Sequence, residues 1–208
     1  MVSGVWGKKV GMTQVFDGDR VVPVTAIDVN NWLVLGFKNT ERDGYEAVVV
    51  GSVRPRYTEK EFSLDWLKKL KTYFAYVREI KLTKSVEGVE IGKPFDVKSA
   101  LTLGDYVDVF GITKGHGFAG GVRRHGFTGA RASHGSTMGK RTGSLGGARS
   151  RGKVFKGKRM PGHMGVSKRV MANLQLVRLV EEPTPLILVK GSVPGKAGSF
   201  VFVRKVSQ

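Results

Sequence analysis

The sequence predicts a mainly β protein, in which a barrel-like body of short strands carries a small α/β insertion and a long, irregular, Gly/Arg/Lys-rich extension. Three observations predict this class. Runs rich in β-branched and aromatic residues recur between turn signals, and a single segment has helical spacing of its apolar residues. In addition, one continuous third of the chain contains many Lys and Arg residues but no Asp or Glu. In chain order we expect the first barrel strands in 1–56, an insertion with one short helix in 57–96, a barrel strand in 97–113, the basic extension in 114–169 and closing barrel strands in 170–208.

The first segment has the pattern of strands separated by turns. An Asp-Gly-Asp turn signal at 17–19 precedes the β-branched run 21–27. Pro23 within that run indicates an edge or bulged position, because proline has no N–H to donate to a neighbouring strand. Two further runs rich in Val, Leu and aromatic residues, 32–37 and 45–50, complete the strands that we expect in this part of the barrel.

In the second segment, 57–96, the spacing of the apolar residues changes from that of a strand to that of a helix. Apolar side chains recur at i, i+3 and i+4 from Trp66 to Phe74, after the N-cap candidate Ser63. We therefore expect a short helix near 63–72, whose aromatic stripe packs against a core rather than stacking on nucleic-acid bases. The alternating run 76–82 then predicts a strand.

The remaining barrel strands flank the extension. The run 105–113 precedes it, and three runs follow it at 174–180, 185–189 and 200–203. The extension is thus expected as an insertion into one body, before its last strands.

The net charge of the chain is +18, from 35 Lys and Arg against 17 Asp and Glu, and it is unevenly placed. Positions 109–180 contain 15 of the basic residues and no acidic one, whereas the other 136 residues carry 20 basic and 17 acidic groups, a net of +3. A field of one sign repels itself, so this tract predicts a polyanionic partner. No run approaches the roughly 20 apolar residues that span a bilayer, which favours nucleic acid over a membrane.

Structured RNA is the polyanion that the extension favours. Its density of glycine cannot build an apolar core, so we expect it to be disordered alone or ordered by a partner. Glycines let backbone N–H groups approach phosphates, arginines donate to phosphates in a fork, and Phe118, Phe127 and Phe155 are spaced to stack on unpaired bases. A reader of DNA grooves would offer a recognition helix, and the pattern predicts none.

Two glycine loops raise the alternative of a nucleotide-dependent enzyme. Residues 115–120 match the dinucleotide fingerprint, but no acidic residue follows about 20 positions later and Gly121 interrupts the expected helix. Residues 147–153 have phosphate-loop spacing, but Val154 stands where magnesium binding needs Ser or Thr. Binding of ATP or NAD would distinguish this enzyme, and competition between duplex DNA and structured RNA would distinguish a third interpretation, a DNA-compacting protein.

The titratable residues of the extension predict neither catalysis nor a metal site. All four histidines, His116, His125, His134 and His163, lie in it, but no carboxylate or thiolate completes a metal-ligand set. Ser133 precedes His134 without a carboxylate to orient the imidazole, so a catalytic triad is not supported. The chain has no cysteine, which excludes disulfides and thiolate sites, and we expect no cofactor and no metal.

Eight short motifs give the chain a resemblance to a known family. They are GKKVGMT at 7–13, TKGHGFAG at 113–120, RHGF at 124–127, SHGS at 133–136, GSLG at 143–146, GKVFKGK at 152–158, GHMG at 162–165 and LVKGSVPG at 188–195. In this order they resemble the bacterial-type large-subunit ribosomal protein L-three family (the universal protein uL-three). The resemblance extends over essentially the whole chain and is weakest over 54–100.

The resemblance implies a structural protein without catalysis, whose six-stranded barrel of the translation-protein type docks on the outside of the large ribosomal subunit. It implies direct and early binding of large-subunit (23S-type) rRNA, with the extension entering the RNA and its tip near the peptidyl transferase centre. The implied neighbours are ribosomal proteins L-fourteen and L-nineteen, with no membrane and no homo-oligomer. The start of the chain has no targeting pattern, so we expect a cytoplasmic ribosome of bacterial type, an organellar ribosome being the alternative.

The cationic and imidazole side chains are the expected rRNA contacts. They are Lys8, Lys9, Lys114, His116, Arg123, Arg124, His125, Arg131, His134, Lys140, Arg141, Arg149, Arg151, Lys153, Lys156, Lys158, Arg159, His163, Lys168 and Arg169. By resemblance, the extension tip comprises Ser144, Leu145, Gly146, Gly147, Ala148, Arg149, Ser150 and Arg151. Many family members have a Gln near this tip that is methylated on its side-chain amide. Equal spacing places Arg149 there, so we expect the modification to be absent, and Thr142 replaces a Pro that is frequent in the family.

Overall fold

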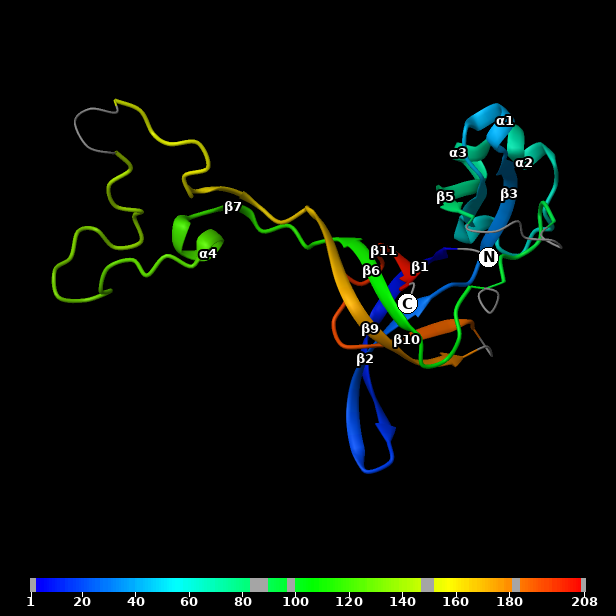
Figure 1. Ribbon diagram of the computed structural model, residues 1–208, viewed down its shortest axis with the longest axis horizontal. Coiled ribbons are helices and arrows are strands. Elements are labelled where there is room, and N and C mark those ends of the chain that lie inside the picture. The colour runs from blue at the N-terminus through cyan, green and yellow to red at the C-terminus, as the bar shows by residue number, and fades with distance from the viewer. Residues whose placement is uncertain (1–2, 83–89, 97–99, 147–151, 181–183, 207–208) are drawn as a thin grey trace. The chain divides into compact units, whose positions relative to one another are not determined.

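The computed structural model describes residues 3–82, 90–96, 100–146, 152–180 and 184–206, and the fold is mainly β, as the sequence predicts (Figure 1). The chain divides into two compact units. The first comprises Met1–Ile112 and Lys168–Gln208, and the second comprises Thr113–Ser167. Lys168 and Arg169, which the sequence analysis assigned to the extension, therefore lie in the first unit, where they begin a strand.

Six strands of the first unit form a closed ring through antiparallel pairs between neighbours. In ring order they are β1 (Gly4–Asp17), β11 (Phe200–Lys205), β6 (Tyr106–Ile112), β9 (Lys168–Val180), β10 (Leu186–Lys190) and β2 (Arg20–Asp28), which returns to β1. The runs predicted at 105–113, 174–180, 185–189 and 200–203 all contribute to this ring. β9 begins well before its predicted run, because main-chain pairing with β6 does not require apolar side chains.

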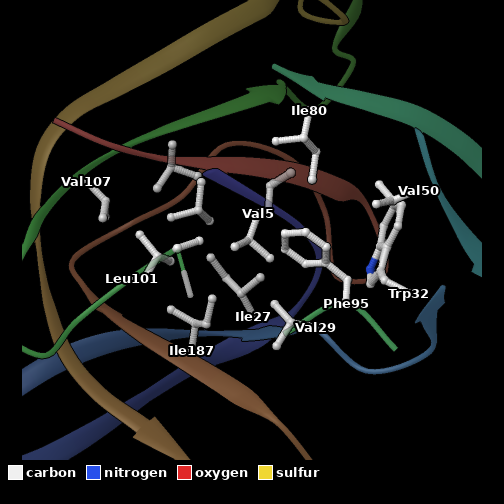
Figure 2. Close-up of a cluster of buried hydrophobic side chains, with 14 of the residues drawn as sticks. Val5, Ile27, Val29, Trp32, Val50, Ile80, Phe95, Leu101, Val107 and Ile187 are labelled. Atoms are coloured by element: carbon white, nitrogen blue, oxygen red, sulfur yellow. The ribbon is translucent and has the colours of Figure 1, made fainter. Parts of the chain in front are cut away.

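Aliphatic side chains fill the interior of the ring. The two-residue period of a strand places them there: Val201 and Val203 on β11 are fully buried, whereas Phe200 and Phe202 are only partly buried. Figure 2 shows side chains from four ring strands converging in this core, namely Val5, Ile27, Val107 and Ile187. Burial of this apolar surface is the main force that closes the ring.

Three further strands form a separate antiparallel sheet, in the order β3-β4-β5. They are β3 (Trp32–Lys38), β4 (Ala47–Val53) and β5 (Phe74–Lys81). The prediction that 32–37 and 45–50 belong to the barrel is therefore wrong, and the expected boundary between 56 and 57 cuts through this sheet. An apolar strand pattern indicates that a strand is buried, but it does not show which strand it pairs with. In the structure, β4 pairs with β3 on one side and with β5 on the other.

The two faces of the three-stranded sheet are buried against different parts of the first unit. On one face, Trp32, Val50 and Ile80 join the core of the ring (Figure 2). On the other, Leu35 and Phe74 pack in a second cluster that includes Trp66 of the helical segment. The sheet is therefore the middle layer of the first unit.

The helical segment consists of two short helices, α2 (Asp65–Lys68) and α3 (Leu70–Tyr73), where the sequence predicts a single helix over 63–72. The helix is broken at Lys69, whose φ of −129° and ψ of 54° are not helical. The N-cap of α2 is Leu64 rather than the expected Ser63.

The core role predicted for the aromatic stripe is confirmed. Trp66 stacks on Tyr73 with ring centroids 4.9 Å apart and meets Phe74 edge-on at 6.0 Å. Two other single turns, α1 (Thr40–Asp43) and η1 (Pro55–Tyr57), lie beside the strands of this sheet in the sequence. No helix within the described ranges has the length and apolar character needed to cross a membrane.

β1 and β2 extend beyond the ring as a two-stranded hairpin of residues 10–23, here called the hairpin arm (Figure 1). β11 pairs with β1 only as far as Lys8, and β10 pairs with β2 only from Val24. Beyond these points, the arm strands form a ladder only with each other among the described residues, and the Pro23 carbonyl accepts one further bond from the Gly191 N–H at 2.9 Å. Gly18 has a φ of 58°, which confirms the predicted turn, and Pro23 lies just outside the β10 ladder, which confirms its predicted edge position.

Candidate RNA-binding interface

The second unit begins with a neck in which residues 113–119 run antiparallel to residues 162–167. The paired strands of the neck are β7 (Gly117–Ala119) and β8 (Gly162–Met164). Nearer the first residue of the unit, the Thr113 N–H donates to the Ser167 carbonyl at 3.0 Å. The neck holds the two ends of the basic tract side by side, so the tract leaves and returns at one place.

The neck requires a glycine at position 165. Gly165 has a φ of 84°, and a Cβ there would overlap the carbonyl of Lys114 and lie 2.9 Å from the Cα of Gly115. Any side chain at this position would push the two backbones apart. The close approach fixes the backbone of Lys114, while the Lys114 side chain remains exposed.

The short helix α4 (Gly121–His125) turns two expected RNA contacts toward the protein. Arg124 Nη1 donates to the carbonyl of Met160 at 2.8 Å, and His125 Nε2 lies 3.0 Å from the same oxygen. Both side chains are half-buried, and the Arg124 guanidinium lies against Gly162, where a Cβ would overlap it. The contacts that the structure gives these two residues hold the returning chain against α4.

A second imidazole of the unit, that of His116, lies beside an arginine side chain. Arg123 Nη2 lies 3.1 Å from His116 Nδ1, and both side chains are exposed. A guanidinium can only donate, so His116 Nδ1 is the acceptor in this contact. The exposed N–H donors of Arg123 that this contact does not use are accessible to acceptors outside the protein. Among the described residues, His, Asp and Glu side chains form no group that could hold a metal ion.

The extension, which we expected to be irregular, contains three short regular elements. β7 and β8 contain three residues each and α4 contains five, so none is long enough to show a periodic pattern in the sequence. α4 follows the dinucleotide-like motif at 115–120 and ends at Gly126, which has a φ of 72°. This single turn differs from the long helix that starts at the pyrophosphate in dinucleotide-binding proteins.

The surface of the second unit is cationic. The sequence places 12 Lys and Arg and no Asp or Glu among its 55 residues, so no carboxylate of the unit can neutralise them. The expected contacts with exposed side chains are Lys114, His116, Arg123, Arg131, His134, Lys140, Arg141, Lys153, Lys156, Lys158, Arg159 and His163. All the ion pairs between described residues lie in the first unit. The positive field of the second unit is therefore directed to an external anion.

The three phenylalanines expected to stack on bases are placed differently. Phe118 is 80% exposed on β7, opposite His163, and Phe155 is 48% exposed. Phe127 instead packs beside His125, with ring centroids 5.9 Å apart, and against Gly121. Phe118 is thus the aromatic side chain of the unit most open to a base.

In the first unit, Lys8, Lys168 and Arg169 are exposed, whereas Lys9, which is also an expected RNA contact, is buried. Lys9 is 9% exposed, and its Nζ donates to the carbonyls of Val193 at 2.6 Å and Gly195 at 3.1 Å. Its ammonium group thus cross-links β1 to the loop between β10 and β11. Strand alternation could have identified this role, because Lys9 shares the inward parity of buried Val5.

The expected tip is described only in part. Ser144 and Gly146 are exposed and Leu145 is half-buried. Gly147, Ala148, Arg149, Ser150 and Arg151 lie outside the described residues, so the expected replacement of the methylated Gln by Arg149 stays a prediction from sequence.

Comparison with known proteins identifies the family of this chain. The sequence model of the family Ribosomal protein L3 matches residues 81–185. "Large ribosomal subunit protein uL3" of Corynebacterium urealyticum is 42% identical over 98% of this chain and 94% of its own length. The protein of the same name from Lacticaseibacillus casei is 44% identical over 97% of this chain and 95% of its own length. That from Pelotomaculum thermopropionicum is 39% identical over 100% of this chain and 99% of its own length. The chain therefore belongs to the ribosomal protein L3 family.

Proposed function

We propose that this chain is a structural constituent of the large ribosomal subunit that binds 23S-type rRNA directly and early in assembly. The observation that supports the proposal most is the second unit, a 55-residue unit with 12 Lys and Arg and no carboxylate. Contacts with phosphates on several sides, and the release of the counterions that accompany those phosphates, would stabilise the complex of such a unit with RNA. The name of its relatives, large ribosomal subunit protein uL3, agrees with this role.

The first unit acts in this proposal as the docking body. The closed ring is a barrel of the translation-protein type that lies on the RNA surface, with exposed Lys8, Lys168 and Arg169 as phosphate contacts. Lys168 and Arg169 pair with the end of β6 at the point where the chain passes into the second unit.

The second unit penetrates the folded RNA. The two paired chain segments of its neck pass together between phosphates, and Arg124 and His125 hold the returning chain against α4 through the Met160 carbonyl. The exposed cations contact phosphates, and Phe118 stacks on an unpaired base. Residues 144–151 then lie toward the peptidyl transferase centre.

The partners and the compartment follow from the same role. We propose ribosomal proteins L14 and L19 as protein neighbours, a bacterial cytoplasmic ribosome as the location and a single copy of the chain in each subunit. Catalysis, cofactor binding and membrane association form no part of this function.

Salt-dependent binding to transcribed 23S-type rRNA tests the proposal. Neutralising one phosphate contact with Lys156→Gln should weaken binding and reduce the slope of log K against log salt by about one unit, without changing RNA preference. Lys68→Gln is the matched control, because Lys68 is exposed in the first unit and is paired with Asp65 at 2.8 Å. Its slope should equal that of the wild type.

Two results would contradict the proposed function. One is wild-type binding that does not change with salt, since phosphate neutralisation must release counterions. The other is saturable micromolar binding of ATP or NAD, which would favour the nucleotide-dependent enzyme. Preference for duplex DNA over structured RNA in competition would instead support a DNA-compacting protein.

A further inference from the structure

The hairpin arm carries an apolar surface that no described part of the protein covers. In the register of β1 with β2, Phe16 lies opposite Val21 and Gln14 lies opposite Pro23, so these four side chains share one face. Met12, two residues before Gln14 on β1, points to the same face. The exposed fractions are 70% for Phe16, 55% for Met12 and 52% for Val21, so three large apolar side chains are exposed on this face, with Gln14 between Met12 and Phe16.

Such an arm gains little stability from the remainder of the fold. An isolated two-stranded hairpin is marginally stable in water and needs a covering surface. Apart from the Pro23 carbonyl, which accepts from the Gly191 N–H at 2.9 Å, its outer strand edges form no strand pair within the described part of the chain. Its apolar face lies outside both buried clusters of the first unit. Clustered exposed apolar side chains of this kind mark an interaction site.

The charge of the arm indicates the class of partner. Residues 10–23 contain Asp17 and Asp19 at the turn and Arg20 as the only base, a net of −1 in a protein of +18. Neither carboxylate has an ion pair among the described residues. RNA phosphates would repel these carboxylates, whereas Lys and Arg of a protein surface would pair with them.

We propose that the hairpin arm is a protein-docking surface: its Met12–Phe16–Val21 face packs on an apolar patch of a basic protein in the same large subunit, whose cations meet Asp17 and Asp19. This inference rests on the proposed function, since it places the chain in a ribosome. It assigns protein recognition to the arm and RNA recognition to the second unit.

Photo-crosslinking in assembled large subunits tests the inference. Phe16 is replaced by the photoreactive analogue p-benzoylphenylalanine in cells whose large subunits contain this chain, and crosslinked species are identified by mass spectrometry. Leu64 is the matched control position, because it is also 70% exposed but lies beside α2. The expected product at position 16 is a crosslink to one basic protein, absent at position 64.

Charge and apolar variants then test the recognition chemistry in the position-16 background. Asp17→Lys with Asp19→Lys should lower the yield of that crosslink at least about threefold by like-charge repulsion. Met12→Ser with Val21→Thr should also lower it, through loss of apolar contact. Sedimentation with the large subunit is measured for each variant, so that yields are compared per incorporated chain.

Each other outcome overturns a defined claim. Failure of the unmodified chain to sediment with large subunits overturns both the proposed function and this inference. With normal incorporation, a position-16 crosslink to RNA, no crosslink, a partner shared with position 64, or a yield unaffected by the charge variants overturns this inference alone.

Discussion

Replacing Lys9 with methionine distinguishes a structural lysine from an RNA contact. In the structure the Lys9 ammonium group is buried and donates to the carbonyls of Val193 and Gly195, at 2.6 and 3.1 Å. Methionine fills nearly the same volume but cannot donate a hydrogen bond. Lys9→Met therefore removes both bonds with little change in packing.

The expected loss is a few kcal/mol. Each buried carbonyl left without a donor costs about 1–3 kcal/mol, and removal of the desolvated charge offsets part of that cost, so we expect about 2–4 kcal/mol in total. For a unit of this size, each kcal/mol lowers the melting temperature by roughly 2–4 °C. The expected decrease is thus about 4–16 °C.

Tryptophan fluorescence during urea or thermal unfolding measures this loss. All three tryptophans, Trp6, Trp32 and Trp66, lie in the first unit, so the signal follows the unit that contains Lys9. Lys8→Met is the control. Because Lys8 is exposed, this substitution should change the free energy of unfolding by less than about 0.5 kcal/mol.

The salt dependence of rRNA binding completes the test. Under conditions where both variants are folded, Lys9→Met should keep the wild-type salt slope, because its charge does not reach phosphate. If Lys9→Met instead retained wild-type stability and lost about one unit of slope, the structural role of Lys9 would be refuted.

Two further changes probe the second unit. Gly165→Ala should separate the backbones of the neck at Lys114, and amide hydrogen exchange of the His116 N–H, which is bonded to the Met164 carbonyl at 2.9 Å, should become faster; unchanged exchange would contradict the close approach. Phe118→Ala should weaken rRNA binding by about 1–3 kcal/mol while leaving the salt slope unchanged, since stacking releases no counterions; wild-type affinity would show that Phe118 does not stack on a base.

The mainly β class and the ring strands after residue 100 could be predicted because each strand contains a short run rich in β-branched, aliphatic and aromatic residues. The sheet to which β3 and β4 belong could not, because a buried strand has the same pattern in either sheet. The helix over 63–72 was predicted in the right place but as one element. Its break at Lys69 has no Gly or Pro to signal it.

In the candidate site, too, some features could be predicted from the sequence and others could not. The sequence locates the cationic tract because charge placement is a property of composition, and most of its Lys and Arg side chains are exposed as expected. Arg124 and His125 have the same residue types as their exposed neighbours, and only their common acceptor, Met160, sets them apart. That acceptor lies 36 and 35 residues along the chain, beyond any local pattern.

By itself, the sequence indicated the class of partner, the carboxylate-free tract and the family, because the placement of charge and the order of the motifs can both be read from the sequence without the fold. Tertiary structure alone decided which strands share a sheet and which cations serve the fold. Lys9 is the clearest case, since its two acceptors are 184 and 186 residues away and become neighbours only when the ring closes. A lysine is exposed or buried according to what folds over it, and that depends on contacts between distant segments.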